Sequence, residues 1–462
     1  MSPRPWRGLA LLPLVAALPA LGQDISGYST TFVRDWKDAA PSQNYLPATE
    51  FLGIDGNNLG SEKLSMHLYG WGQRDLADQS YLPGKSAGDL SYGYLQYRFG
   101  QANAELKAGR FSINQGIGFQ SVDGVSGKTD LRGGFTVSAF AGKPVVYKNL
   151  SENRQSEASF QQDVIFGGRL GWRAGLLGEV GVSYLQDGSK PAYQYADSGD
   201  PQTQDYTRRL LGADIWVAPA AFLDFRGRTV WDVSDRPQPA PGNDPSRLAE
   251  HDYRATAKLS DTVSLGGTYV ERHFAAYYAG STLPSNLFNP AQQGSFKATG
   301  LLATWQATGI VQLTADVRRT SRENYGDSTR YGADVRCNWS DRNLQAGAGY
   351  HKVNAFTVPA LDVITPAYSL SHGEWRAWVL GQRGNLSASL DAILLNFTDA
   401  AENPFLYGKS SETALVGSVG YQAKADLKVS GDLSLDDSAV VRQTMGLVRV
   451  EYRFGLAGKG GK

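Results

Sequence analysis

Residues 446–454 read Gly-Leu-Val-Arg-Val-Glu-Tyr-Arg-Phe and alternate apolar with charged side chains. In a β-strand successive side chains point to opposite faces, so this segment has one apolar and one charged face. The apolar face carries Val448, Val450, Tyr452 and Phe454, and the charged face carries Arg449, Glu451 and Arg453. In a soluble sandwich the apolar face would meet a second sheet. In a membrane barrel it meets lipid, and the charged face meets a water-filled lumen.

The same alternation recurs along the chain and predicts an all-β fold, a transmembrane antiparallel β-barrel of about 22 strands. Short connections with turn residues alternate with long polar ones, which predicts short periplasmic turns and long extracellular loops. The segments 48–55 and 119–128 are the weakest, and omitting both gives about 20 strands. The predicted strands are 25–34, 48–55, 62–74, 89–99, 104–113, 119–128, 134–143, 162–173, 178–187, 206–218, 222–232, 250–260, 263–273, 295–306, 310–319, 329–339, 344–353, 369–380, 386–395, 412–422, 427–436 and 441–454.

The first 22 residues form a unit of their own. Arg4 and Arg7 precede an apolar run from Leu9 to Leu21, and Gly22 is followed by Gln23. This order predicts a signal peptide at 1–22 that is removed before Gln23, because the apolar run is too short for a membrane anchor. Residues 23–454 then form the barrel, and residues 455–462 form a short polar C-terminal tail.

Composition restricts the other classes of function. The chain has 45 basic and 45 acidic residues, and removal of the two arginines of the signal peptide leaves 43 against 45. No excess positive charge attracts nucleic acid, so we expect no nucleic-acid partner. Cys337 is the single cysteine, which excludes an internal disulfide. The five histidines are scattered in sequence, so we predict no metal site, no cofactor and no catalytic residue.

The closing stretch resembles the last strand of porin-like outer-membrane β-barrels of Gram-negative bacteria, since it alternates and ends in Phe454. A weaker resemblance, to barrels of the alginate-export type, covers Val122 to Lys128 and Gly134 to Val145. The resemblance implies the cell outer membrane as the location. It also implies contact with outer-membrane lipid and lipopolysaccharide, and with the barrel assembly machinery that reads the last strand.

Two functions from different classes remain open at this point. The first is a porin-like channel for passive diffusion of small polar or charged solutes. The second is a structural sheath that holds a partner such as a multihaem cytochrome in a porin-cytochrome conduit. An outer-membrane enzyme is the third and weakest hypothesis, because no nucleophile stands out with its base. The oligomeric state, including a homo-oligomer, also stays open.

The charged faces of the predicted strands supply the candidate lumen residues. Opposite charges recur two residues apart on one strand, as at Asp224 and Arg226. We expect opposite charges on neighbouring strands to neutralise one another and keep the inner surface wet, and their field to order water and filter solutes. Five basic residues, Arg98, Arg169, Arg228, Lys258 and Arg272, have no acidic neighbour two residues away on their own strand, which predicts a slightly basic lumen and a weak preference for anions. The lumen and selectivity candidates are Arg98, Arg169, Asp224, Arg226, Arg228, Arg254, Lys258, Arg272, Asp316, Arg318, Asp334, Arg336, Glu374, Arg376, Arg449, Glu451 and Arg453.

The apolar faces supply predictions about closure and register. We expect the last strand, with Val448, Val450, Tyr452 and Phe454 toward lipid, to close the barrel by pairing with residues 25–34. Cys337 shares a face with Val335 and Trp339, so we expect it to point toward lipid close to a short turn.

Overall fold

The computed structural model describes residues 24–37, 44–77, 86–145, 164–195, 201–234, 248–273, 295–322, 326–355, 357–358, 368–369, 371–398, 400, 403, 406–439 and 442–456. Almost all of these residues lie in β-strands. Two short 3-10 turns, Arg132–Gly134 and Ser340–Arg342, connect strands. Within these ranges no helix has the length and apolar character needed to cross a membrane.

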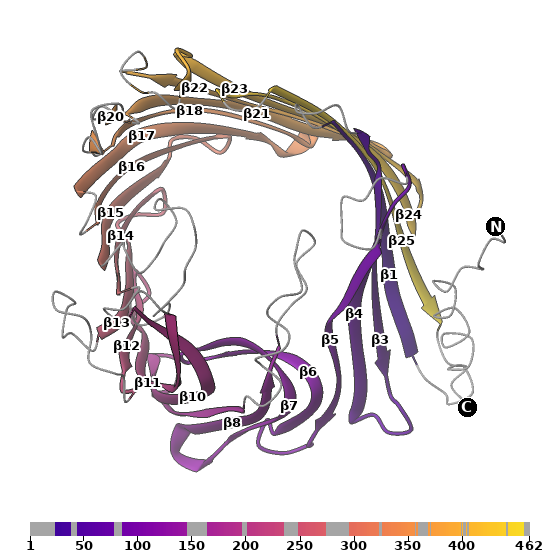
Figure 1. Cartoon of the computed structure of the whole chain (residues 1–462), viewed down its shortest axis with the longest axis vertical. Coiled ribbons are helices and arrows are strands. Elements are labelled where there is room, and N and C mark those ends of the chain that lie inside the picture. The colour runs from indigo at the N-terminus through magenta and orange to yellow at the C-terminus, as the bar shows by residue number, and fades with distance from the viewer. Residues whose placement is uncertain are drawn as a thin grey trace.

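Twenty-two strands pair in antiparallel order around a closed ring (Figure 1). This confirms the predicted all-β barrel, with β3 and β7 at the two weakest segments, so the count of 20 is wrong. The strands are β1 (Asp24–Lys37), β3 (Pro47–Asn57), β4 (Leu64–Asp75), β5 (Ser86–Arg98), β6 (Glu105–Gln115), β7 (Gly118–Asp130), β8 (Phe135–Pro144), β9 (Ile165–Arg173), β10 (Gly178–Tyr195), β11 (Pro201–Ala220), β12 (Leu223–Asp232), β13 (Leu248–Lys258), β14 (Val263–His273), β15 (Ser295–Gln306), β16 (Val311–Arg322), β17 (Gly326–Trp339), β18 (Leu344–Asn354), β21 (His372–Arg383), β22 (Leu386–Phe397), β23 (Ser411–Lys424), β24 (Leu427–Asp437) and β25 (Arg442–Leu456).

Three two-residue strands lie outside the order of the 22 barrel strands, one in the same sheet and two in a small sheet of their own. β2 (Asn44–Tyr45) extends the sheet beside the end of β1, where Tyr45 lies opposite Trp36. β19 (Thr357–Val358) pairs with β20 (Tyr368–Ser369) in the connection between β18 and β21. These pairings leave the order of the 22 barrel strands unchanged.

The ring closes where the sequence predicts. β25 pairs with β1 from Ile25 opposite Leu456 to Trp36 opposite Met445. The strand therefore runs two residues beyond the predicted end at Phe454, because Gly455 and Leu456 find backbone partners on β1. The predicted signal peptide and residues 457–462 of the predicted tail lie outside the described residues.

The two rims of the barrel differ in their connections. One rim, here called the short-turn rim, holds connections such as 221–222, 384–385 and 425–426. The opposite rim, here called the long-loop rim, holds connections such as 233–247 and 274–294. Some connections at the long-loop rim depart from the predicted alternation, since only Gly116 and Ile117 separate β6 from β7 and only residues 323–325 separate β16 from β17.

Candidate functional site

Contacts between strands that are not neighbours identify the face of the sheet that points into the ring. Nε2 of Gln120 on β7 donates a hydrogen bond to Oδ2 of Asp187 on β10, at 3.3 Å, although β8 and β9 lie between them. A Cβ atom at Gly116 would lie 1.8 Å from Oγ of Ser183 on β10. Strands this far apart in the sheet meet through the interior, and Figure 1 shows β6 and β7 curving into the ring. Asp187 and Ser183 therefore point inward.

The strand register carries this assignment around the whole barrel, because residues directly opposite each other in an antiparallel pair share a face. Followed from Ser183 through each neighbouring pair, the inward face includes every charged residue predicted to line the lumen. These residues are Arg98, Arg169, Asp224, Arg226, Arg228, Arg254, Lys258, Arg272, Asp316, Arg318, Asp334, Arg336, Glu374, Arg376, Arg449, Glu451 and Arg453.

The opposite face is apolar and exposed. Val448, Val450, Tyr452 and Phe454 lie on it, as predicted, and 57% of Val448 is exposed. Leu301 on β15 is 64% exposed on the same face. Cys337 also lies on the outward face, two residues before β17 ends at the short-turn rim. Alternation along each strand therefore separates an apolar outer surface from a charged inner surface.

Ion pairs on the inner surface mostly join neighbouring strands, as in the pairs Arg228–Glu250 and Arg449–Asp432. Arg226 also reaches Asp224 on its own strand, at 3.7 Å. Arg376 binds Asp391 on β22 at 2.5 Å. The reason is distance, since opposite residues of paired strands lie about 5 Å apart and residues i and i+2 of one strand about 6.5 Å apart.

Several basic residues that have no acidic neighbour two residues away on their own strand find a carboxylate elsewhere. Arg228 binds Glu250 on β13 at 2.8 Å, and Arg272 lies 3.6 Å from the same carboxylate. Lys258 lies 3.0 Å from Asp261 in the adjoining turn. Arg226 and Arg254 lie directly opposite each other, which places two like charges side by side on the inner surface. Fewer unneutralised basic side chains therefore contribute to a net positive field in the lumen than the sequence suggested.

The largest feature of the interior is a hairpin formed by residues 111–122 of β6 and β7, here called the inner hairpin. The upper part of β6 separates from β5, whose pairing with β6 ends at Gly93 opposite Arg110. Three glycines lie in one row across the bend, with Gly109 opposite Gly124 and Gly124 opposite Gly142. A Cβ atom at any of them would lie 2.1–2.4 Å from a backbone oxygen of the neighbouring strand. The sheet can fold inward here because this row has no side chains.

The inner hairpin forms a second layer over the wall made by β9 to β13. Phe111, Ile113 and Val122 are each at most 5% exposed. They belong to a buried apolar cluster whose wall side consists of Ile165, Leu185, Leu210, Val230 and Ala249. Burial of a large apolar side chain stabilises a fold by about 1.5–3 kcal/mol, so this cluster holds the inner hairpin against the wall.

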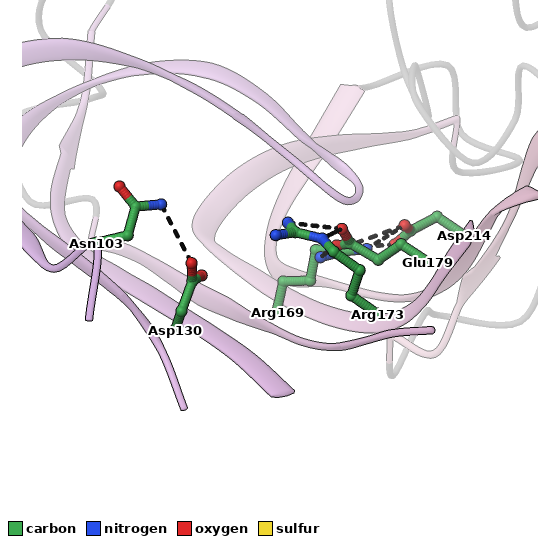
Figure 2. A network of polar contacts seen from close by, with 6 residues as sticks. All are labelled: Asn103, Asp130, Arg169, Arg173, Glu179 and Asp214. Carbon is green, nitrogen blue, oxygen red and sulfur yellow. Dashed lines mark hydrogen bonds and ion pairs between the residues drawn. The ribbon is translucent and has the colours of Figure 1, made fainter. Parts of the chain in front are cut away.

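A charged network lies next to the tip of the inner hairpin (Figure 2). Arg169 on β9 donates to Asp214 on β11 at 2.6 Å and to Glu179 on β10 at 2.6 Å. Arg173 donates to the other oxygen of Glu179 at 3.0 Å. The guanidinium group of Arg169 fits because a Cβ atom at Gly181 would lie 2.4 Å from it. Arg169, which has no acidic neighbour two residues away on its own strand, is thus neutralised by Glu179 from the neighbouring β10 and by Asp214 from β11, one strand further along.

Figure 2 also shows a hydrogen bond at the short-turn rim, between the β5–β6 turn and the end of β7. Nδ2 of Asn103 donates to Oδ2 of Asp130 at 3.3 Å. Asn103 adopts a φ of 46°, in the left-handed region that asparagine tolerates better than most residues. The contact fixes the turn between β5 and β6 to the end of β7, below the bend of the inner hairpin.

A histidine and two carboxylates meet on β16, β17 and β18, a group that sequence reasoning missed. Nε2 of His351 lies 2.9 Å from Asp316 and 3.5 Å from Asp334. One ligand atom from each residue lies within 4.8 Å of the others, which is the spacing of a candidate metal site. Arg330 also binds Asp316, at 3.1 Å. The cluster is therefore satisfied as an ion-pair network by its own protein groups.

Comparisons with known proteins support the fold and nothing finer. No protein-family model matches the sequence, and neither does any curated protein. Among solved structures, the ferric enterobactin receptor PfeA from Pseudomonas aeruginosa is similar with a TM-score of 0.57 and 10% identity, over 93% of this chain and 81% of that one. The siderophore receptor PirA from the same organism also gives a TM-score of 0.57 and 10% identity, over 93% and 80%. At this identity the similarity concerns the barrel alone.

Proposed function

We propose that this chain is an outer-membrane channel for passive diffusion of small polar or charged solutes. The observation that carries the proposal is the separation of faces around a closed ring. Every charged residue traced above lies on the inward face, while large apolar side chains such as Leu301 and Val448 are exposed on the outward face. A closed barrel satisfies all its backbone groups in lipid, and a polar interior holds water.

The outward surface supports the outer membrane of a Gram-negative cell as the location. Exposed apolar side chains on 22 strands would aggregate in water, whereas lipid covers them. By the usual arrangement of such barrels, the short-turn rim faces the periplasm and the long-loop rim faces outside. Membrane lipid and lipopolysaccharide are then the surrounding partners, and the barrel assembly machinery acts on β25.

The inner hairpin sets where solutes pass. It covers the inner wall of β9 to β13 with a second layer, so we expect solutes to pass along the inward faces of the other strands. The walls of that path carry both signs of charge, such as Asp316 and Arg449. Mixed charges keep the path wet and favour small polar solutes over apolar ones.

A weak preference for anions is part of the proposal. Arg226 and Arg254 face each other across β12 and β13, and the side chain of Arg226 is 58% exposed. Their fields add in a confined space, where screening by salt is weaker than in bulk water. Changing Arg226, Arg228 and Arg254 to glutamate should therefore shift the reversal potential under a salt gradient toward cations.

Conductance of the purified, folded protein in a planar lipid bilayer tests the channel. We expect discrete open steps in salt solution and a small anion preference, with the triple arginine variant open but cation-preferring. Heat-modifiable migration on a gel confirms that both proteins are folded. A folded barrel that never conducts contradicts the proposal, and recovery of that closed barrel with a haem protein would favour the sheath hypothesis instead.

A further inference from the structure

Six aromatic rings form a continuous strip on the neighbouring strands β1, β3, β4 and β5. Figure 1 shows these four strands at one side of the ring. The ring centroids of Phe32 and Phe51 are 5.8 Å apart, and those of Phe51 and Tyr69 are 6.1 Å apart. The ring centroids of Tyr69 and Tyr92 are 5.5 Å apart. The strip, here called the aromatic strip, consists of Tyr28, Phe32, Phe51, Tyr69, Tyr92 and Tyr94.

The register places the aromatic strip on the inward face. Tyr28 lies opposite Arg453 on β25 and opposite Gly53 on β3. Gly53 in turn lies opposite Tyr69, which lies opposite Tyr92. A Cβ atom at Gly53 would lie 2.6 Å from Cε1 of Tyr28, so the glycine leaves room for this ring to lie against the wall.

The tyrosine hydroxyls of the strip have no hydrogen-bond partner among the residues that the structure describes. Tyr28, Tyr69, Tyr92 and Tyr94 form no side-chain hydrogen bond within the described residues. Tyr28 is also 38% exposed. A wall that only needed to hold water could be built from charged and small residues, as it is in β16 and β17. Contiguous, partly exposed rings whose hydroxyls make no hydrogen bond within the described residues are the composition of a ligand-binding surface.

Polar groups flank the strip at the end nearer the short-turn rim. Nδ1 of His67 lies 2.6 Å from Asp55, and its other ring nitrogen lies 3.1 Å from Oγ of Ser65. The ring of His67 lies 5.0 Å from that of Tyr94, and Nζ of Lys107 lies 5.3 Å from the same tyrosine ring. Hydrogen-bond donors and hydrogen-bond acceptors therefore lie next to an apolar surface on which a ring can stack.

We propose that the aromatic strip binds an oligosaccharide and guides it through the barrel. A pyranose ring has an apolar C–H face, which can stack on tyrosine, and a rim of hydroxyl groups, which can bond to the four free hydroxyls and the polar flank. A simple ion would gain nothing from the rings, and an aliphatic solute would leave these hydroxyls unpaired. The inference rests on the proposed channel and names one class of its solutes.

The test measures binding and conduction separately, with maltohexaose as the probe. Isothermal titration calorimetry on the detergent-purified barrel reports binding without conduction, and block of the bilayer current by the same sugar reports passage along the strip. We expect both in the wild type. The double variant Tyr69→Ala/Tyr92→Ala should weaken binding by about tenfold, because two stacked rings are lost.

Two control variants separate a specific strip from general effects. Tyr69→Phe/Tyr92→Phe keeps the rings and loses two hydroxyls, so it should weaken binding by less than the alanine pair. Trp378→Ala removes an inward aromatic side chain on β21, outside the strip, and should leave binding unchanged. Heat-modifiable migration confirms that each variant is folded.

Each outcome bears on one proposal. Absence of sugar binding, or equal losses in Trp378→Ala and the alanine pair, overturns the aromatic strip as a carbohydrate site. Binding of 4-hydroxybenzoate without binding of sugar also overturns it, in favour of aromatic solutes. Sugar binding to a barrel that never conducts supports the strip and contradicts the channel.

Discussion

The barrel has two sectors that are built differently. In the sector from β6 to β13 the inner hairpin lies on the wall and buries an apolar cluster, including Leu185 at 2% exposed. In the sector from β14 to β25 the wall is a single layer whose inward face carries charged side chains such as Asp316 and Arg449 beside scattered apolar ones such as Leu302. Hydrogen bonding between strands therefore suffices to keep the single-layer wall folded. In the sector from β6 to β13 the apolar cluster additionally holds the inner hairpin, which fills part of the interior.

The glycine content of the two sectors differs in the same way. The row Gly109, Gly124 and Gly142 permits a bend because a Cβ atom at each position would meet backbone oxygen. In the single-layer sector Gly266 has no atom closer than 3.7 Å to such a Cβ atom. A glycine in a barrel strand is therefore informative only where a neighbouring backbone approaches it closely.

The largest expected effect is loss of the folded barrel, in which both sectors unfold together. Deleting Gly446 to Lys462 takes away most of β25 and leaves the facing edges of β1 and β24 unpaired in lipid. Each unpaired backbone group costs several kcal/mol there, so the loss is on the order of tens of kcal/mol. That exceeds the roughly 5–15 kcal/mol of a typical domain. We expect no heat-modifiable, folded species after detergent extraction.

Two shorter deletions sharpen this result. Removing Gly455 to Lys462 should still give a folded barrel, although it also removes the two residue pairs that extend β25 past Phe454. Removing only residues 457–462 leaves the whole strand and should be neutral. Loss of the compact form in the shortest deletion would show that these last residues are needed for folding or assembly.

The alternation of side chains made the barrel and its inward face predictable from the sequence. Val448 and Arg449 point to opposite faces whatever surrounds them, because the period of a strand is local. The pairing of β1 with β25 was predictable because an open edge in lipid is too costly. The inward position of residues as far apart as Arg98 and Arg453 followed from the same two facts.

Partners across strands were not predictable in the same way. His351 meets Asp316 and Asp334 because the register of β16, β17 and β18 brings them together, and no spacing within one segment encodes that register. The inner hairpin was also missed, since β6 and β7 show ordinary alternation. The short connection at Gly116 was the one sequence feature that could have indicated the inner hairpin, because most connections at this rim are long.

The second prediction compares leucines from the two sectors. Leu185→Ala leaves a cavity under the inner hairpin and should lower the free energy of unfolding by about 2–5 kcal/mol. Leu302→Ala, at an inward site that is 38% exposed in the single-layer sector, should cost much less. Urea unfolding followed by tryptophan fluorescence measures both. Equal losses would mean that the cluster contributes no special stability.

The third prediction acts on the bend itself. Gly124→Ala places a Cβ atom 2.1 Å from the carbonyl oxygen of Ala141, so the strands must shift, at a cost of about 1–3 kcal/mol. We expect larger current noise and a changed unit conductance, because the inner hairpin packs less tightly. Gly266→Ala has room for its Cβ atom and serves as the matched control. A Gly124→Ala channel that conducts and unfolds like the wild type would show that the bend does not need this glycine.

The smallest expected effect lies at the long-loop rim of the single-layer sector, where Nζ of Lys409 contacts Oδ1 of Asp437 at 2.7 Å. The hydrogen bond from Lys409, assisted by the charge of Arg442, lowers the pKa of Asp437. A carboxylate with a lowered pKa stabilises the folded state above its unfolded pKa, and this stabilisation is lost as the pH falls through the folded pKa. Asp437→Asn should therefore lower the Tm slightly near neutral pH, by about 1 °C, because exposed pairs are weak and screened by salt. The difference from the wild type should vanish as the solution becomes acidic, and it should be absent at neutral pH in a Lys409→Gln background. If the Tm difference between Asp437→Asn and the wild type grows in acid, or is the same with glutamine at position 409, this ion pair does not stabilise the rim.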